Sequence, residues 1–415
     1  MPDDATARTS SQGTVAGLLD EIAGVGTDPG RGGYTRPVYS TAELDLRSWV
    51  VAQAEGRSLD VETDRNGIIW AWWNPTNLPL RDAVVTGSHM DSVPGGGAFD
   101  GPLGVASAFV AVDQLRQRNI TPRHPLAIAV FPEEEGSRFG IACLGSRLMT
   151  GAIPAEKAAR LTDVDGNTFA DLAARHGLDP ASLGRDDERL RRIGRFVELH
   201  VEQGRGLVDL HRPVAIGASI LGHGRWRLSI TGEGNHAGTT LMSDRQDPMV
   251  AAGQIVVAVR DTALSEPNAR ATVGRLVAIP GGTNVIASRV DIWLDVRHPD
   301  DAVTAALVRR IGDRAQEIAT REDCRATLTE ESLSATVHFD SSLRDELAGT
   351  LPNAPILDTG AGHDAGVLAG HVPTAMLFVR NPTGISHSPA EHVEDGDAEL
   401  GAAALAGVLE RLLTN

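Results

Sequence analysis

Cysteines, aromatic residues and long apolar runs are all scarce in this chain of 415 residues. Its two cysteines, Cys143 and Cys324, lie far apart in the sequence, which excludes a disulfide framework and favours a reducing cytoplasm. Aromatic residues make up only 4%, so the core must be built mainly from Ala, Val, Leu and Ile. No apolar run reaches the ~18 residues of a membrane-spanning helix, and the N-terminus lacks the basic and apolar regions of a signal peptide. We therefore expect a cytoplasmic protein with no membrane partner.

Basic residues are also fewer than acidic residues. The sequence has 38 Lys and Arg residues against 55 Asp and Glu residues, a formal net charge of −17. A field of this sign repels polyphosphate, so nucleic acid is not an expected partner. The G-x-S-x-G motif of many serine hydrolases is also missing, which disfavours serine-type hydrolysis.

The length predicts two domains, because single hydrophobic cores stop growing at roughly 250–300 residues. Apolar strands are expected at 83–86, 126–131, 196–201 and 374–379, and they alternate with helices. This order is typical of an α/β domain with a mostly parallel sheet covered on both faces. A polar cluster follows each strand, at the sheet edge where such folds bind ligands.

The stretch from 214 to 330 has a different order of elements. We expect strands at 226–231, 271–278, 287–296 and 324–330, with helices at 247–264 and 300–319. The resulting βαββαβ order is typical of a ferredoxin-like α+β unit. The prediction is a catalytic domain split between residues 1–213 and 331–415, with an inserted domain at 214–330.

Two acidic residues and a histidine follow the first of these strands. His89 and Asp91 are two residues apart, and a histidine that binds metal usually donates its second N–H to such a neighbour. Asp100 is flanked by glycines, which allow the backbone to approach a metal closely. A surface histidine beside an acid, and an aspartate that caps a helix, are the structural alternatives.

Three further polar motifs follow the other strands. Glu133, Glu134 and Glu135 come directly after an apolar strand, where one glutamate can bind metal and its neighbour can accept a proton. A solvated acidic surface is the alternative. His200, near the end of the strand at 196–201, and His387, after the last strand, complete a mixed N/O set suited to Zn²⁺, Mn²⁺, Co²⁺ or Ni²⁺.

Seven segments of the sequence resemble the hydantoinase/carbamoylase branch of the dinuclear-metal peptidase superfamily. They are GSHMDSVPGGGAFDG, FPEEEGSRFG, ELHVEQG, GEGNHAGTTLMSDRQDP, TNVIASRVDIWLDVRH, GAGHDAG and GISHSPAEHV. The branch includes N-carbamoyl-L-amino-acid hydrolases and allantoate amidohydrolases. The resemblance runs from about residue 20 to the C-terminus, with the motifs in the order of the family.

The resemblance implies two divalent metal ions per subunit and a role for each matching residue. The implied metal ligands are His89, Asp100, Glu134, His200 and His387, with Asp100 as the bridge. The implied catalytic residues are Glu133 as general base, Asp91 as the partner of His89, and His236 as the donor to the oxyanion. The implied substrate-binding residues are Gln203, His236, Asn284, Arg297, Gly362 and His363.

The activity that the resemblance implies is hydrolysis of the ureido C–N bond of an N-carbamoyl-L-amino acid or of allantoate, with release of ammonia. It also implies a homodimer formed through the inserted domain, which would act as a lid. Leu241, Ala287 and Arg380 depart from the usual family pattern, and Arg380 puts the identity of the substrate in doubt. The alternatives are an N-acyl-amino-acid deacylase or dipeptidase of the same superfamily, and a non-catalytic metal-binding protein.

Overall fold

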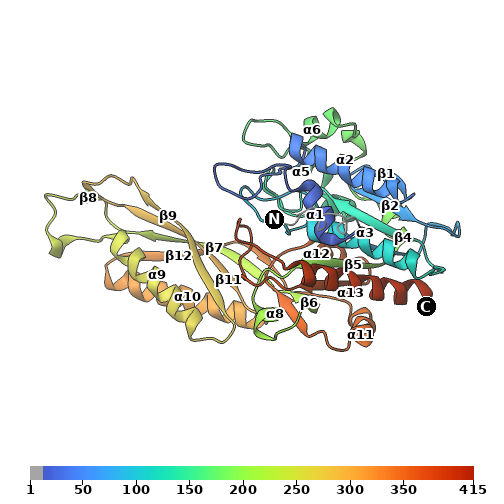
Figure 1. The fold of residues 1–415 in the computed structure, drawn as a ribbon. Helices are drawn as coiled ribbons and strands as arrows, with labels where there is room; N and C mark the ends of the chain where they lie inside the picture. Colours follow the sequence, from blue (N-terminus) through green and yellow to red (C-terminus); the bar gives the residue numbers. More distant parts are fainter. Residues whose placement is uncertain (1–12) are drawn as a thin grey trace, which may run out of the picture. The chain divides into compact units, whose positions relative to one another are not determined.

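The computed structural model describes residues 13–415, and the chain divides into two compact units (Figure 1). The first unit comprises the residues up to 219 together with 338–415, and the second comprises 220–337. Among the described residues, no helix is long and apolar enough to cross a membrane.

A nine-stranded sheet forms the centre of the first unit. Its spatial order is β1 (Asp60–Thr63), β2 (Ile69–Trp73), β4 (Leu126–Phe131), β3 (Ala83–His89), β5 (Ile193–Val201), β15 (Thr374–Val379), β6 (Val214–Ile220) and β13 (Val337–His338), with β14 (Ile356–Thr359) paired to β6. The four strands β4, β3, β5 and β15 are parallel, whereas β2 and β6 pair antiparallel at their two sides. Every residue of β3, β4 and β15 is buried, because both faces of the central sheet are covered.

The helices of the first unit surround this sheet and one another. They are α1 (Val15–Ile22), α2 (Thr41–Gly56), α3 (Pro102–Gln117), α4 (Leu144–Thr150), α5 (Ala155–Ala159), α6 (Phe169–Arg175), α7 (Asp187–Arg192), α8 (Gly206–Asp209), α11 (Ser341–Thr350), α12 (Asp364–Leu368) and α13 (Asp395–Thr414), with a short 3-10 helix at Pro180–Ser182. Of these, α1, α3 and α13 pack together against one large core cluster (Figure 1). The short helix α12 instead contacts β5, β15 and α4.

Small residues bring α3 close to the sheet. A Cβ at Gly104 would collide with the main-chain oxygen of Leu199 on β5, so only glycine permits this approach. Pro102 occupies the first turn of α3, where its fixed φ is compatible with a helix start. The loop that precedes α3 is therefore held directly over the ends of β3 and β5.

The second unit has its own core and an antiparallel four-stranded sheet. Its elements along the chain are β7 (His223–Thr231), α9 (Pro248–Leu264), β9 (Arg270–Ile279), β11 (Arg289–Arg297), α10 (Asp301–Arg321) and β12 (Arg325–Ser334). They follow the βαββαβ order expected of a ferredoxin-like unit, and the strands lie in the order β12-β7-β11-β9. A ribbon of β8 (Asn235–His236) and β10 (Val285–Ile286) and a 3-10 helix at Met242–Asp244 complete the unit.

The border between the units lies further along the chain than the sequence predicted. The strand β6 was placed in the inserted domain, but it pairs with β15 in the large sheet through Ile216 and Leu377. The second unit therefore begins at residue 220 rather than 214, and it ends at 337 rather than 330.

Candidate metal centre

The candidate ligands come from the ends of neighbouring strands. His89 is the last residue of β3, and His200 is the penultimate residue of β5, which pairs with β3 in parallel. Glu134 and Glu135 follow β4, and His387 follows β15. Because β4, β3, β5 and β15 are adjacent and parallel, these residues come from one edge of the sheet.

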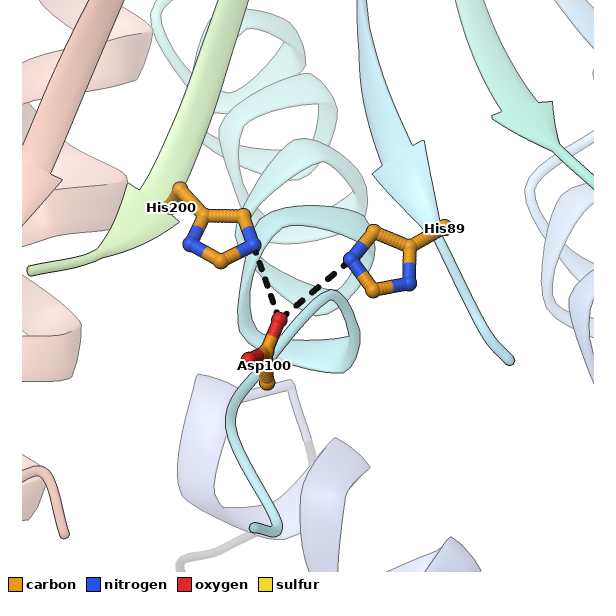
Figure 2. Close-up of side chains that lie close together, drawn as sticks. All are labelled: His89, Asp100 and His200. Atoms are coloured by element: carbon orange, nitrogen blue, oxygen red, sulfur yellow. Dashed lines mark ion pairs between the residues drawn. The ribbon is translucent and has the colours of Figure 1, made fainter. Parts of the chain in front are cut away.

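Asp100 lies between His89 and His200 (Figure 2). Its Oδ1 atom is 3.4 Å from Nε2 of His89 and 3.2 Å from Nε2 of His200. The Nδ1–H of His89 donates to the carbonyl oxygen of Asp91, and that of His200 donates to Val201, both at 3.0 Å. Because a carbonyl oxygen only accepts, each ring carries a proton on Nδ1, which leaves Nε2 as the atom that can bind a cation in place of a proton. A cation is the group that such an arrangement accommodates.

The close approach of Asp100 to His89 depends on a glycine. Gly101 has a φ of 88°, and a Cβ there would lie 2.6 Å from two ring atoms of His89. Gly101 is also the N-cap residue of α3, so Asp100 is not the helix cap that the sequence left open. The Asp100 carboxylate instead accepts hydrogen bonds from Nε2 of Gln203 (3.1 Å) and from the hydroxyl of Ser386 (3.3 Å).

A second group of possible ligands faces the other oxygen of Asp100. Nε2 of His387 is 3.4 Å from Oδ2 of Asp100 and 3.3 Å from Oε2 of Glu135. The side chain of Glu135 is buried, whereas that of His387 is half exposed. Asp100 therefore offers one oxygen to each group, and the ligand atoms within each group lie close enough together to hold a metal ion.

The structure changes the expected role of Glu134. This residue belongs to neither of the two groups around Asp100, although the sequence predicted it as a ligand. Its Oε2 atom is 3.8 Å from Nε2 of His89, and its Oε1 atom accepts a hydrogen bond from the thiol of Cys143 at 3.3 Å. The geometry favours the neighbouring Glu135 as the ligand.

Glu133, the predicted general base, has a different environment. It is fully buried, and its Oε1 atom accepts hydrogen bonds from the main-chain N–H groups of Arg138 (2.9 Å) and Phe139 (2.6 Å). These bonds hold the loop after β4, which indicates a structural role. The chain adopts a left-handed conformation at Glu133 (φ 54°), so Glu134 and Glu135 no longer follow the direction of β4.

Asp91 supports the same loop. Its carboxylate accepts hydrogen bonds from the N–H groups of Glu134 and Glu135, both at 3.1 Å. The sequence predicted this carboxylate as the partner of His89, but its Oδ1 atom is 3.6 Å from Nδ1, and the hydrogen bond goes to the main-chain carbonyl. Asp91 therefore orients His89 through its backbone and the glutamates through its side chain.

Negative charge is concentrated at this centre. Burial raises the pKa of Glu135 to about 8, and the nearby Asp100 carboxylate adds to the effect. Burial also raises the pKa of Glu134 well above its usual value. Burial alone would raise the pKa of Asp100. Hydrogen bonds from His200 and His89, and their positive charge, have the larger effect and hold the pKa of Asp100 well below the usual value. Divalent cations would neutralise this buried charge, and the mixed N/O donors suit Zn²⁺, Mn²⁺, Co²⁺ or Ni²⁺.

A comparison with known families decides the assignment of the chain. Residues 85–411 match the sequence profile of peptidase family M20/M25/M40. The chain belongs to this family. The matched segment contains every residue of both groups around Asp100, from His89 to His387.

Individual relatives place the chain more closely within the M20/M25/M40 family. The N-carbamoyl-L-amino acid amidohydrolase of Geobacillus stearothermophilus is 36% identical over 391 residues, which covers 93% of this chain and 95% of the relative. The allantoate amidohydrolase of Bacillus subtilis (strain 168) is 33% identical and covers 92% and 93%. A crystal structure of a hydantoinase/carbamoylase family amidase from Burkholderia multivorans has a TM-score of 0.86 at 30% identity and covers 97% of both chains. The predicted resemblance to this branch is confirmed.

Three residues predicted to line the substrate pocket of this family member lie in the first unit. Gln203 contacts Asp100, as described above. The ring of His363 is buried, with its centroid 4.4 Å from that of His200. Burial and the neighbouring His200 lower the pKa of His363 well below its usual value, so the ring is neutral. Gly362 precedes it and is exposed.

The other predicted substrate residues belong to the second unit. His236 and Asn284 are exposed and lie at the β8–β10 ribbon, where the N–H of Ala237 donates to the Asn284 carbonyl at 3.0 Å. Arg297 ends β11, and its guanidinium forms a two-pronged pair with Asp295 at 2.6 and 3.0 Å. Their roles towards a substrate stay predictions.

Sequence reasoning missed two buried glutamates beside the ligands. Glu198 lies two residues before His200 and accepts hydrogen bonds from the Ser88 hydroxyl (2.9 Å) and the Ala365 N–H (3.0 Å). Glu391 follows His387 by four residues and is also buried. Both lie in motifs that also carry a predicted ligand, ELHVEQG and GISHSPAEHV. An acidic residue within a few positions of that ligand is the feature of the sequence that could have indicated them.

Proposed function

We propose that the chain is a two-metal amidohydrolase that hydrolyses the carbamoyl C–N bond of a small ureido carboxylate and releases ammonia. The substrate is an N-carbamoyl-L-amino acid or allantoate. The observation that carries the proposal is the placement of Asp100, with one oxygen towards His89 and His200 and the other towards His387 and Glu135. Relatives named for both reactions match more than nine-tenths of the chain, which supports this substrate class.

In this proposal each cation has three protein ligands. His89, His200 and Asp100 hold the first, and Glu135, His387 and Asp100 hold the second. A pair of divalent cations in such a site lowers the pKa of a water molecule towards neutrality and polarises the carbonyl that is attacked.

Glu134 is the residue that we propose as the general base. It is adjacent to the proposed ligand Glu135, and its carboxylate faces the first group at 3.8 Å from His89. Burial raises its pKa, which suits a group that accepts a proton from the attacking water and holds it. Glu134 then passes this proton to the leaving nitrogen, and the carbamate product breaks down to CO₂ and ammonia.

Substrate binding is assigned to the second unit in this proposal. The guanidinium of Arg297 binds the substrate carboxylate through a two-pronged contact, as it binds Asp295 in the free protein. His236 donates a hydrogen bond to the oxyanion, and Asn284 binds the substrate beside it. We also propose a homodimer formed through this unit, acting as a lid, and a cytoplasmic location consistent with two free cysteines.

An ammonia-release assay on metal-reconstituted protein tests the function. The panel is allantoate, N-carbamoyl-L- and D-amino acids, N-acetyl amino acids and dipeptides, with amine release measured for the last two. We expect turnover of at least one ureido acid and little of the others. Turnover confined to N-acetyl amino acids or dipeptides would replace the proposal with a deacylase or dipeptidase of the M20/M25/M40 family.

A further inference from the structure

Glu391 links two loops that carry proposed ligands. Its side chain is buried, and its Oε1 atom accepts hydrogen bonds from the main-chain N–H groups of Phe99 (3.1 Å) and Asp100 (2.9 Å). Glu391 follows His387 by four residues and so belongs to the same loop as His387, far from Asp100 in the sequence. One carboxylate therefore fixes the backbone of the bridging Asp100 from the His387 loop.

The glycine-rich loop before α3 is shaped around this carboxylate. A Cβ at Gly97 would collide with the carboxyl group of Glu391, so only glycine leaves room for it. This is the second observation that ties Glu391 to the placement of Asp100.

The other oxygen of Glu391 reaches the ligands through Ser386. The Ser386 hydroxyl lies 3.1 Å from Oε2 of Glu391 and 3.3 Å from Oδ2 of Asp100, and it accepts a hydrogen bond from Nε2 of Gln203 at 3.0 Å. A hydroxyl has one proton to donate, which it shares between the two carboxylates. Ser386 directly precedes His387, so the network joins Asp100 and His387, two of the three residues of the second group, to Glu391.

The two cation positions depend on this network to different degrees. His89 and His200 lie on strands and are held by main-chain carbonyls, independently of Glu391. His387, in contrast, lies in a loop with a left-handed backbone (φ 55°) and a half-exposed side chain. The second group is therefore the one whose geometry a loop movement would change.

We propose that Glu391 is a positioning residue that sets the affinity of the second cation position. It acts by holding Asp100 and His387 at a fixed separation, and it leaves the first position largely intact. The inference rests on the proposed two-cation function. Residues that orient metal ligands typically contribute roughly 10- to 100-fold to metal affinity.

Metal titration of four proteins tests the proposal: the wild type, E391A, E391Q and E394Q. Binding of Zn²⁺ and of Mn²⁺ is followed by calorimetry, and the metal content is measured after dialysis. E394Q is the matched control, because Glu394 is exposed and, among the residues that the structure describes, its carboxylate pairs only with the exposed His392. We expect E391A to bind the first cation with near wild-type affinity and the second roughly 10- to 100-fold more weakly. Its turnover should return with excess metal while KM for the substrate changes little.

E391Q separates hydrogen bonding from mere filling of space. The amide oxygen still accepts both N–H bonds, and the amide nitrogen donates to Ser386, so we expect most of the affinity to return. Equal affinities in E391A and wild type would overturn the inference alone, as would equal weakening of both positions in E391A. If E391A fails to fold, S386A takes its place and should weaken the second cation selectively; unchanged binding there overturns the inference. A wild-type chain that binds fewer than two cations would overturn the proposed function as well.

Discussion

His89 and His200 lie on adjacent parallel strands with their ring centroids 5.7 Å apart and their planes inclined by 24°. Each ring is fixed by a hydrogen bond from Nδ1 to a main-chain carbonyl, and each Nε2 faces the same oxygen of Asp100. The backbone at the ends of β3 and β5 therefore sets the direction of both nitrogen ligands. A cation position with this support is present in the fold before metal binds.

Removal of metal should abolish activity and lower the thermal stability of the chain. A ligand that binds only the folded state stabilises it by RT ln(1 + [L]/Kd), about 4 kcal/mol at a thousandfold excess over Kd. We expect the chelated protein to remain folded but inactive, with a lower Tm, and to recover on addition of Zn²⁺, Mn²⁺, Co²⁺ or Ni²⁺. Circular dichroism measures folding and Tm, metal analysis measures the loss and return of the cations, and ammonia release measures activity. Full turnover by a metal-free preparation would contradict the proposal.

The three consecutive glutamates should respond differently to substitution by glutamine. E135Q should lose affinity for one of two cations, because Glu135 faces His387 and Asp100. E134Q should keep both cations and lower kcat by about 10²- to 10⁴-fold, the usual contribution of a general base. E133Q should remain active, because an amide oxygen still accepts the N–H groups of Arg138 and Phe139.

Metal content and single-turnover kinetics of the three variants distinguish these roles. Loss of chemistry in E133Q with both cations bound would restore Glu133 as the base. Loss of a cation in E134Q rather than E135Q would restore Glu134 as a ligand.

Much of the first unit could be predicted because its central strands are buried on both faces. Continuous apolar runs marked β4 and β15 with the same bounds that the structure shows. Polar residues at or beyond the ends of such runs made His89, Asp100, His200 and His387 candidates, since parallel strands end at one edge of a sheet, and the structure brings these side chains together. The sequence did not show that Glu135, rather than Glu134, lies beside Asp100 and His387, because the left-handed turn at Glu133 depends on hydrogen bonds to residues further along the chain.

Long-range pairing explains what the sequence did not reveal. The apolar pattern of β6 fits either unit, and its pairing within the large sheet, with β15 above all, assigns it to the first. The role of Glu391 likewise depends on a contact with Asp100, 291 residues away in the sequence. Local patterns predict elements and the residues at their ends, but not which distant loop they meet.

The metal-free chain should lose stability as the pH rises from 6.5 to 8. Burial raises the pKa of Glu135 to about 8, and burial together with Glu198 raises that of Asp364 to about 8. In the unfolded chain these carboxyl groups ionise near pH 4. Across this interval the folded chain binds more protons than the unfolded chain, so the free energy of unfolding falls as pH rises. The buried His363, whose pKa is lowered, has the opposite effect only below its usual pKa of 6.5.

Thermal unfolding of chelated protein at several pH values between 6.5 and 8 measures this effect. The matched variant is D364N, which keeps the oxygen that accepts from the Ser146 hydroxyl but removes one carboxyl group. Its Tm should depend less steeply on pH than that of the wild type. Bound cations should also flatten the dependence, because they compensate the charge of Glu135. A constant or rising Tm of the metal-free wild type would contradict the expected protonation.

Arg297 should determine recognition of the substrate carboxylate rather than the chemical step. Its guanidinium already holds one carboxylate, that of Asp295, in a two-pronged contact, so a substrate carboxylate can be bound in the same way. A hydrogen bond to a charged group contributes about 1.5–3 kcal/mol, so R297A should raise KM roughly 10- to 150-fold. R297K should be intermediate, because lysine keeps the charge but loses the planar fork.

Decarboxylated ureido analogues provide the decisive comparison for Arg297. They lack the group that Arg297 binds, so their kcat/KM should be the same in R297A and wild type. Arg225 also faces Asp295, at 3.8 Å, but it is largely exposed, and R225A therefore serves as the control for altered charge near Asp295. Equal losses for carboxylated and decarboxylated substrates in R297A would assign Arg297 a role in the fold of the second unit, because only a direct contact discriminates between them.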